Sequence, residues 1–196
     1  MVIDKDITID LNGKTLKNVA TDNGWITSNA KLTIKNGSMS FDGTAVYAQS
    51  GELNLIDCDI IQTGTTGGNA VYVSEGVTAV ISECSIEATG KNGNATAVWY
   101  GIGVVGGNVT VKNSTVNGFH GGITALSNSV LNIDGGEFIG TYWHGLNIYD
   151  AEVTLSNEPE FDGKAGDVQV YQTTATINGV TFDAGIYTQD QVYDKL

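Results

Sequence analysis

The feature that most constrains the fold of this chain is an internal repeat of about 22 residues. Segments that begin at Val109, Leu131, Val153 and Ala175 follow one another at intervals of 22 residues. Each segment has a short apolar alternation, a turn and one further apolar residue. Similar segments begin at positions 7, 32, 53 and 79; from 32 onward the spacings are 21, 26 and 30 residues, and the excess lies in glycine-rich loops. Such a repeat predicts a solenoid, in which each coil packs on its neighbours.

Within each repeat, alternation with a period of two residues predicts a β-strand with one buried side. The third residue of each strand then points inward, which gives a column of core residues: Ile9, Ile34, Leu55, Ile81, Val111, Ile133, Leu155 and Ile177. The eighth position turns inward again, and a second strand follows without any helical pattern between. We therefore predict an all-β fold, a single-stranded right-handed parallel β-helix (solenoid) of about eight coils.

The two ends of the sequence indicate how the solenoid begins and ends. The length of 196 residues fits a single β-helix domain over 1–196, and because Met1 leads directly into strand-like sequence, we expect a fragment of a larger protein. Residues 188–196 are interpreted as a C-terminal cap, with Val192, Tyr193 and Leu196 packed on the last coil. No cap precedes the first coil. Since an uncovered edge invites pairing, we expect a homotrimer or flanking domains.

The opening segment Ile7-Thr-Ile-Asp-Leu-Asn-Gly-Lys-Thr-Leu16 and the repeats after it resemble the pectin-lyase-like superfamily of right-handed parallel β-helices. The resemblance covers nearly the whole chain, which is also similar in architecture to β-helix regions of bacterial surface proteins and to phage tailspikes. It implies a secreted, extracellular protein at a bacterial cell surface or on a phage virion. The superfamily contains lyases, hydrolases, adhesins and passive stalks, so the likeness is specific for the fold alone.

The charge of the chain disfavours several classes of partner. The formal net charge is −13, and all nine basic residues are lysines. Nucleic acids and anionic lipids are bound by basic surfaces, so neither is expected as a partner. Without arginine the chain lacks the bidentate fork that clamps carboxylates, which disfavours acidic sugars. The longest apolar stretches are too short to span a bilayer, so no direct membrane insertion is expected.

Three aromatic residues occupy the outward position of the second strand in successive repeats: Tyr47, Tyr72 and Trp99. Stacked on the outer surface, their flat faces suit the C–H faces of sugars, and an exposed apolar patch indicates a ligand. The loops before Tyr72 and Trp99 are rich in Thr, Asn and Gly. We therefore predict a carbohydrate-binding site at these three residues. The alternative is that the rings stack only on one another, or lie under a loop or a partner chain.

A second aromatic cluster contains Phe119, His120, Tyr142, Trp143 and His144. His120 and Trp143 should nearly superpose one coil apart, with Phe119 and Tyr142 paired beside them. Tyr142, Trp143 and His144 are therefore further candidates for carbohydrate binding. Aromatic side chains that only pack a loop are the alternative. The sequence around the two histidines echoes fragments of β-helix enzyme motifs, but the basic partners of those motifs are absent.

Acidic residues gather at the first turn. Asp57 and Glu83 hold equivalent positions in adjacent repeats, so their carboxyl groups are expected about 5 Å apart, near the separation in retaining glycosidases. They are the candidates for catalysis, and with Asp59 they are the candidates for a calcium site. A solvated or hydrogen-bonded turn is the alternative. No other cofactor is indicated.

The two cysteines, Cys58 and Cys84, occupy the same position in adjacent repeats. Their expected spacing lies within disulfide range, but side chains stacked in parallel point alongside one another. We therefore predict two free, buried thiols. Metal binding needs more ligands than this pair supplies.

Together these features favour an extracellular adhesive or carbohydrate-binding β-helix module without catalysis, whose partner is a glycan or a cell-surface polysaccharide. One alternative is a polysaccharide-degrading enzyme, a hydrolase or a tailspike-type depolymerase, that uses the turn carboxylates Asp57 and Glu83. A second alternative is a passive structural spacer.

Overall fold

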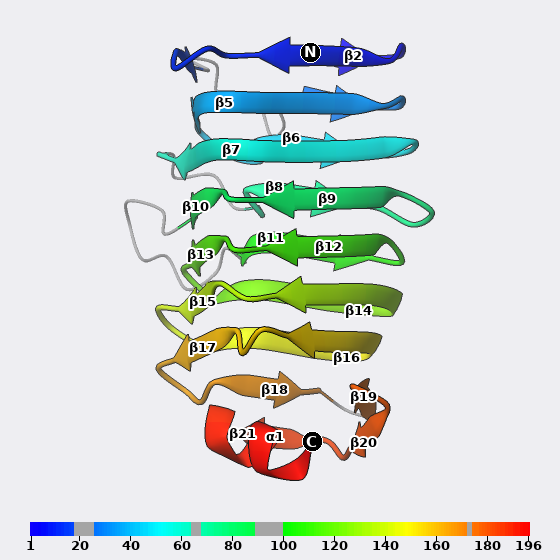
Figure 1. Cartoon of the computed structure of the whole chain (residues 1–196), viewed down its shortest axis with the longest axis vertical. Coiled ribbons are helices and arrows are strands. Elements are labelled where there is room, and N and C mark those ends of the chain that lie inside the picture. The colour runs from blue at the N-terminus through cyan, green and yellow to red at the C-terminus, as the bar shows by residue number, and fades with distance from the viewer. Residues whose placement is uncertain (18–25, 64–67, 89–99, 172–173) are drawn as a thin grey trace.

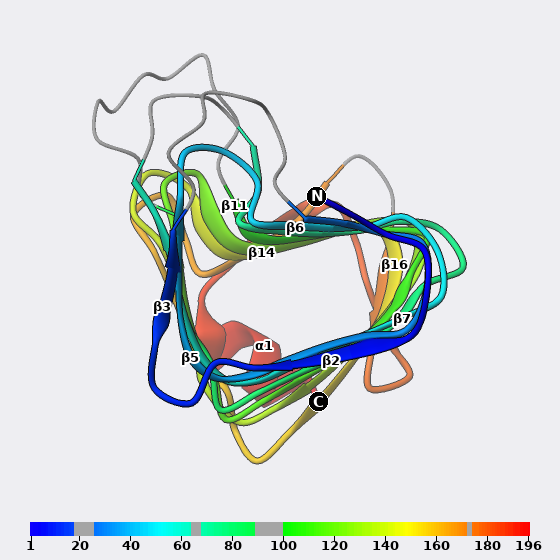
Figure 2. The same ribbon diagram turned by 90° about the horizontal axis from the view of Figure 1, so that it is seen from above.

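The computed structural model describes residues 1–17, 26–63, 68–88, 100–171 and 174–196. The chain winds as a rod of stacked coils, with the N-terminus at one end and helix α1 at the other (Figure 1). Viewed along the rod, each coil has three sides, which we name the first, second and third faces (Figure 2). Strands of neighbouring coils pair in parallel along each face. The predicted all-β parallel β-helix is therefore confirmed.

Three series of strands build the three faces. The first face contains β2 (Ile7–Asp10), the first halves of β5 (Leu32–Phe41) and β7 (Glu52–Gln62), β9 (Thr78–Ser82), β12 (Asn108–Lys112), the second halves of β14 (Gly121–Asp134) and β16 (His144–Ser156), and β19 (Ala175–Ile177). The second face contains β3 (Thr15–Lys17), the second halves of β5 and β7, β10 (Ser85–Ala88), β13 (Thr115–Gly118), β15 (Glu137–Gly140) and β17 (Glu160–Gly163). The third face contains β1 (Val2–Ile3), β4 (Ile26–Ser28), β6 (Val46–Ala48), β8 (Val71–Val73), β11 (Tyr100–Val105), the first halves of β14 and β16, β18 (Val168–Val170) and, antiparallel to it, β21 (Gly185–Tyr187).

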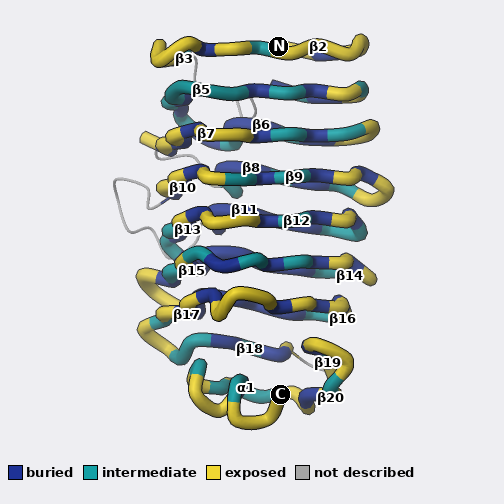
Figure 3. The backbone as a smooth tube through the Cα atoms, viewed as in Figure 1, coloured by how far each residue is buried: buried dark blue, intermediate teal, exposed yellow. Residues whose placement is uncertain are grey.

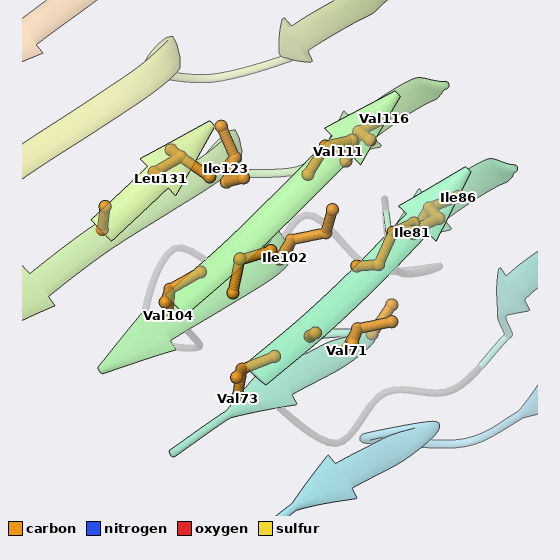
Figure 4. Close-up of a cluster of buried hydrophobic side chains, with 14 of the residues drawn as sticks. Val71, Val73, Ile81, Ile86, Ile102, Val104, Val111, Val116, Ile123 and Leu131 are labelled. Atoms are coloured by element: carbon orange, nitrogen blue, oxygen red, sulfur yellow. The ribbon is translucent and has the colours of Figure 1, made fainter. Parts of the chain in front are cut away.

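The interior of the rod is a continuous column of aliphatic side chains from all three faces. Ile81 of the first face, Ile86 of the second and Val71 of the third converge in the close-up of Figure 4, and each is at most 1 % exposed. Buried and exposed residues alternate along the strands (Figure 3). Of the predicted core column, Ile34, Leu55, Ile81, Val111, Ile133 and Ile177 are fully buried, Leu155 is buried, and Ile9 in the first coil is partly buried. Removal of this apolar surface from water is the main source of stability.

The second face corrects the prediction of two strands per coil. Residues at the eighth position, such as Ile86 and Val116, lie within regular strands, and β10 pairs with β13 over four residues. The prediction missed these strands because the bend before them needs only a left-handed residue. Asn36, with φ of 58°, bends β5 from the first face to the second without interrupting the strand.

The C-terminal repeat leaves the regular coil. β19 pairs in parallel with β16 but antiparallel with β20 (Val180–Phe182), so this repeat closes as a hairpin. The next segment forms α1 (Gln189–Lys195), which begins with a capping box between Thr188 and Gln191. Within the described residues, no helix has the length and apolar character needed to cross a bilayer.

Helix α1 covers the core at this end of the rod (Figure 2). Val192 is fully buried, and Tyr193 packs against the core while its hydroxyl donates to the carbonyl oxygen of Pro159 at 2.6 Å. Leu196, the third residue expected to pack there, is 40 % exposed. Two of the three residues expected in a cap therefore contact the last coils.

Candidate functional site

The turn between the first and second faces repeats one backbone conformation from coil to coil. Equivalent residues have positive φ: Asn36, Asp57, Glu83, Asn113, Gly135 and Asn157. Asp57 and Glu83 are equivalent, as predicted, because Ile56 pairs with Ser82 before them and Asp59 with Ser85 after them. A left-handed residue at each of these turns redirects the chain, and this structural role accounts for their position.

The acidic residues of this turn do not form a described metal centre. Asp59 lies on the second face, where its Oδ2 accepts a hydrogen bond from Ser38 Oγ at 3.4 Å. Among the described residues, no group of three or more His, Cys, Asp or Glu side chains could hold a metal ion. Calcium at Asp57, Asp59 and Glu83 thus gains no support from the geometry, and catalysis by the turn carboxylates stays a prediction.

The two cysteines follow directly in the same turns. Cys58 and Cys84 are buried and unbridged, so the prediction of two free thiols is confirmed. Each Sγ donates to a backbone carbonyl two residues earlier, at 3.3 Å. The hydrogen bond with Cys58 and burial together raise the pKa of Cys84, so this thiol stays protonated. Their role is to fill the interior at the bend.

The predicted aromatic column on the third face consists of two described residues. Tyr47 pairs with Tyr72, and their rings meet edge to face with centroids 5.0 Å apart. The next residue in register is Gly103, which pairs with Tyr72, so the expectation that Trp99 continues the column was wrong. Trp99 itself lies outside the described residues. Burial, and to a lesser degree the neighbouring Tyr47, raise the pKa of Tyr72.

The second aromatic cluster is arranged as predicted, at the corner that leads into the third face. The rings of His120 and Trp143 stack with centroids 4.5 Å apart and an interplanar angle of 21°. Those of Phe119 and Tyr142 stack at 5.5 Å and 14°. Tyr142 and Trp143 are 42 % and 39 % exposed. These two rings therefore present aromatic surface to solvent while they pack on the preceding coil.

His144 does not share this exposure. It is only 3 % exposed, and its Nδ1 lies 2.8 Å from the carbonyl oxygen of Gly166. Since a carbonyl oxygen can only accept, Nδ1 is the protonated nitrogen of the neutral ring. Burial lowers the pKa of His144, so the ring is neutral at physiological pH. Its buried position offers little surface to a sugar, and the predicted contact gains no support.

Beside this cluster, the outer side of the third face is hollowed. A cavity of about 280 Å³ lies there, and we call it the lateral groove. It is lined by residues from neighbouring coils: Tyr100, Thr124, Leu126, Trp143, Asn147, Ile148, Tyr149, Gln169 and Tyr171. Four of these residues are aromatic, and three others carry an amide or an aliphatic hydroxyl group. None is acidic or basic.

Two rows of outward residues shape the groove. In the first row, Thr124 pairs with Asn147, and Asn147 pairs with Gln169. Their neighbours along each strand are core residues, so alternation directs these three side chains outward. In the second row, the ring of Tyr149 lies 6.0 Å from that of Tyr171. The polar row therefore forms the floor, with an aromatic row along one margin.

A glycine and a buried tyrosine form the opposite margin. Gly121 pairs with Tyr100, and a Cβ on this glycine would lie 2.7 Å from Cε1 of Tyr100 and 2.8 Å from Nδ2 of Asn147. Both side chains therefore cover the glycine. The backbone N–H of Tyr100 donates to Oδ1 of Asn69 at 3.3 Å, which fixes this margin. Burial raises the pKa of Tyr100 to about 12, so its hydroxyl remains neutral.

Asn147 differs from the other polar residues of the floor because its amide nitrogen is buried without a hydrogen-bond partner. It is 6 % exposed, and its buried Nδ2 has no hydrogen-bond partner among the described residues. Leaving a buried donor unpaired costs about 1–3 kcal/mol.

Sequence reasoning placed Trp143 in a site but missed the rest of the groove. The repeats contained the signal. Thr124, Asn147 and Gln169 occupy, in their third-face strands, the same outward position that Tyr72 occupies in β8. Only the aromatic members of this column were taken as candidates. Gly103 separates these polar members from the two tyrosines in the column.

Comparison with known families adds to this picture. Residues 19–183 match the family described as right handed beta helix region, and this range includes every residue of the groove. No curated protein and no solved structure matches the chain. The match indicates no ligand, and it fits the resemblance to the pectin-lyase-like superfamily. By its repeat, its three-faced rod and this match over most of its length, the chain belongs to the right-handed β-helix family.

Proposed function

We propose that this chain is an extracellular carbohydrate-binding β-helix module that contacts a glycan through the lateral groove, without a catalytic step. The observation that supports this most directly is the combination of aromatic and amide side chains in one concave site. Sugars present C–H faces that pack on aromatic rings and hydroxyl groups that bond to amides. A largely apolar hollow with a few placed polar groups is typical of small-molecule sites.

The aromatic residues of the lining supply surface that a polysaccharide can reach. Trp143 and Tyr171 are 39 % and 49 % exposed, and both line the groove. Trp143 is backed by the stacked ring of His120, which holds its orientation before a ligand arrives. Tyr142, at 42 % exposure, extends the aromatic surface beyond the groove.

The net charge of −13 favours a neutral glycan over one that carries carboxylates, because like charges repel at the approach. An adhesive role at a bacterial cell surface or on a phage virion belongs to the same proposal. So does association as a homotrimer or with flanking domains.

The test is a screen of neutral polysaccharides and host glycans against the folded chain, followed by calorimetry on a glycan that binds. Trp143→Ala should weaken binding at least about tenfold, a loss of about 1.4 kcal/mol, because it removes the ring shared by the groove and the stacked cluster. The control is Ile61→Ala, which removes a side chain of similar exposure, 40 %, from the second face.

A third variant, Tyr72→Ala, tests the rival site on the same face. Unchanged affinity in Trp143→Ala together with loss of binding in Tyr72→Ala would move the site to the tyrosine pair. A chain that binds none of the glycans in the screen would favour the passive spacer.

A further inference from the structure

We infer that the lateral groove binds the ammonium group of an amino sugar, beside the rings of Tyr149 and Tyr171 and the amide oxygen of Asn147. This inference rests on the proposed function and specifies its ligand class. It combines three properties of the groove: the accessible acceptor on its floor, the aromatic rings of its lining and the charge of the strands that build it.

The amide of Asn147 offers the groove an acceptor. Its nitrogen is buried over Gly121 beside the ring of Tyr100, so the oxygen is the atom of this amide that a ligand can reach. An amide oxygen can only accept hydrogen bonds. The hydroxyl of Thr124 and the amide of Gln169, in the neighbouring coils of the floor, can donate or accept. The one group of the floor with a fixed role therefore favours a donor on the ligand, such as a hydroxyl or an ammonium group.

The aromatic rings of the lining favour an ammonium group over a hydroxyl group. Asn147 and Tyr149 are two residues apart on β16, so their side chains leave the same side of the strand about 7 Å apart. The ring of Tyr171 lies beside that of Tyr149, with centroids 6.0 Å apart. A cation within about 6 Å of a ring centre is attracted by the electron-rich face of the ring, and a neutral hydroxyl group gains much less. An ammonium group at Oδ1 of Asn147 can make both contacts.

The charges around the groove favour a cation as well. The third-face strands that build it, β11, β14, β16 and β18, contain the acidic residues Asp134, Asp150 and Glu152 but no lysine. Asp150 directly follows Tyr149, at the aromatic margin. The net charge of −13, which disfavours a carboxylate, attracts an ammonium group toward the whole molecule.

A lysine lies near the opposite margin. The ammonium nitrogen of Lys164 is 5.9 Å from the ring centre of Tyr142, next to Trp143. Asp167 offsets this charge, since its own negative charge acts on the ring of His144 at the same margin. The position of Lys164 shows that an aromatic ring of this surface can hold an ammonium group. The aromatic margin, which has no lysine in its strands, is therefore the place for the ammonium group of the ligand.

The rest of the lining suits a sugar ring. The volume of about 280 Å³ is at the small end for ligand sites, which limits the groove to about one sugar residue. The exposed ring of Trp143 offers a surface for sugar C–H groups, and Thr124 and Gln169 remain for the sugar hydroxyls. These further contacts distinguish an amino sugar from the ammonium group of a lysine side chain on a peptide.

The test uses calorimetry on the whole chain at about pH 6.5, where a primary amine is charged. The linear trimer of glucosamine should bind at least about tenfold more tightly than the trimers of N-acetylglucosamine and of glucose, which lack the charge. This preference should shrink at least about threefold when the salt concentration rises from about 20 mM to about 300 mM, because salt screens the attraction. Trilysine, which carries amines without a sugar ring, should bind more weakly than the glucosamine trimer.

The variant Tyr149→Leu tests the aromatic contact. It keeps an apolar side chain but removes the ring, so the preference for the glucosamine trimer should fall at least about threefold. The matched control is Tyr47→Leu, in the edge-to-face pair of the N-terminal half, which should keep the preference.

The variant Gln169→Glu tests the charge of the groove by a gain of affinity. A carboxylate of nearly the same shape at this half-buried position should strengthen binding of the glucosamine trimer about fivefold and leave the glucose trimer no tighter. Gln49→Glu adds the same charge at an exposed position after β6 on the third face, outside the groove, and should change neither affinity. Melting temperatures show whether each variant remains folded.

The outcomes separate this inference from the proposed function. A glucose trimer that binds as tightly as the glucosamine trimer, or a preference undiminished in Tyr149→Leu, would overturn the ammonium assignment and leave glycan binding in place. Trilysine that binds as tightly as the glucosamine trimer would assign the groove to a basic peptide instead. Failure of every trimer and of every glycan in the screen to bind would overturn both.

Discussion

One column of outward positions on the third face has a different character in the two halves of the rod. In the N-terminal half it holds Tyr47 and Tyr72, whose rings meet edge to face at 5.0 Å. In the C-terminal half the same column continues as Gly103, Thr124 and Asn147, and the surface becomes the lateral groove. Aromatic residues in the column pack against one another, whereas small and polar residues leave a hollow.

The two halves show that an aromatic ladder and a binding site require different side chains at the outward positions of a solenoid. Neighbouring coils bring equivalent side chains close together, so large rings in one column use their surface on each other. A ligand needs rings at the margins and short side chains between them. Trp143 and Tyr171 line the groove with exposed rings, and Thr124 belongs to its floor.

The largest expected effect comes from making the groove resemble the tyrosine pair. Thr124→Tyr would place a ring in this column and fill the groove from its floor, so glycan affinity should fall at least about 30-fold, or about 2 kcal/mol. Calorimetry on the glycan identified in the screen measures the loss. Thr110→Tyr, at an outward position of β12 on the first face, is the control and should bind normally.

Circular dichroism decides whether Thr124→Tyr has kept its β-structure, because an overpacked floor would also abolish binding. A folded variant with undiminished affinity would contradict the assignment of the groove as the site.

A smaller effect is expected in the N-terminal half, on stability alone. A double-mutant cycle with Tyr47→Ala and Tyr72→Ala should give a coupling energy of about 0.5–1.5 kcal/mol, the typical value for an edge-to-face pair. Urea unfolding followed by circular dichroism provides the four free energies. Coupling near zero would mean that the two rings do not stabilise each other, and the pair would then be free to serve a ligand.

The sequence was sufficient to predict the fold because its alternation and its period are local signals that every coil repeats. Ile34, Leu55 and Ile81 fall in one buried column, as their spacing predicts. The second face was missed for a local reason as well. A left-handed Asn36 bends β5 between two faces, and no break in the pattern marks the start of a new one.

The main error of the sequence prediction was the strand register after the longest loop. Glycines in the third-face strands indicate the correct register. Gly101, Gly122 and Gly145 are the second residues of β11, β14 and β16, which run along the third face in successive coils. A Cβ at Gly101 would lie 2.2 Å from Cγ1 of Val116 on the second face. Only glycine fits such a close approach. Aligning these glycines places Gly103, not Trp99, after Tyr72 in the column.

The groove was harder to predict because it depends on contacts between coils. The 23-residue offsets from Phe119 to Tyr142 and from His120 to Trp143 indicated the stacked cluster correctly. The unsatisfied amide of Asn147 has no sequence signature, since it results from the side chains that surround it in the folded chain.

The smallest expected effect distinguishes the two halves by their response to acid. Both histidines of the chain, His120 and His144, lie beside the groove, and burial lowers the pKa of each below its usual value of 6.5. The unfolded chain therefore binds these protons more readily, so stability is fully present above about pH 6.5 and falls as the pH drops toward the folded pKa values. Asp167 partly opposes the shift at His144 through its negative charge.

Melting temperatures measured from about pH 7.5 to about pH 5.5 should therefore decline in the unmodified chain and decline less in His144→Gln. Glutamine retains an N–H donor for the carbonyl oxygen of Gly166 but does not titrate. Because the N-terminal half contains no histidine, Tyr72→Ala should lower the melting temperature by a similar amount at every pH in this range. An acid response of equal size in His144→Gln and in the unmodified chain would show that His144 does not contribute to it.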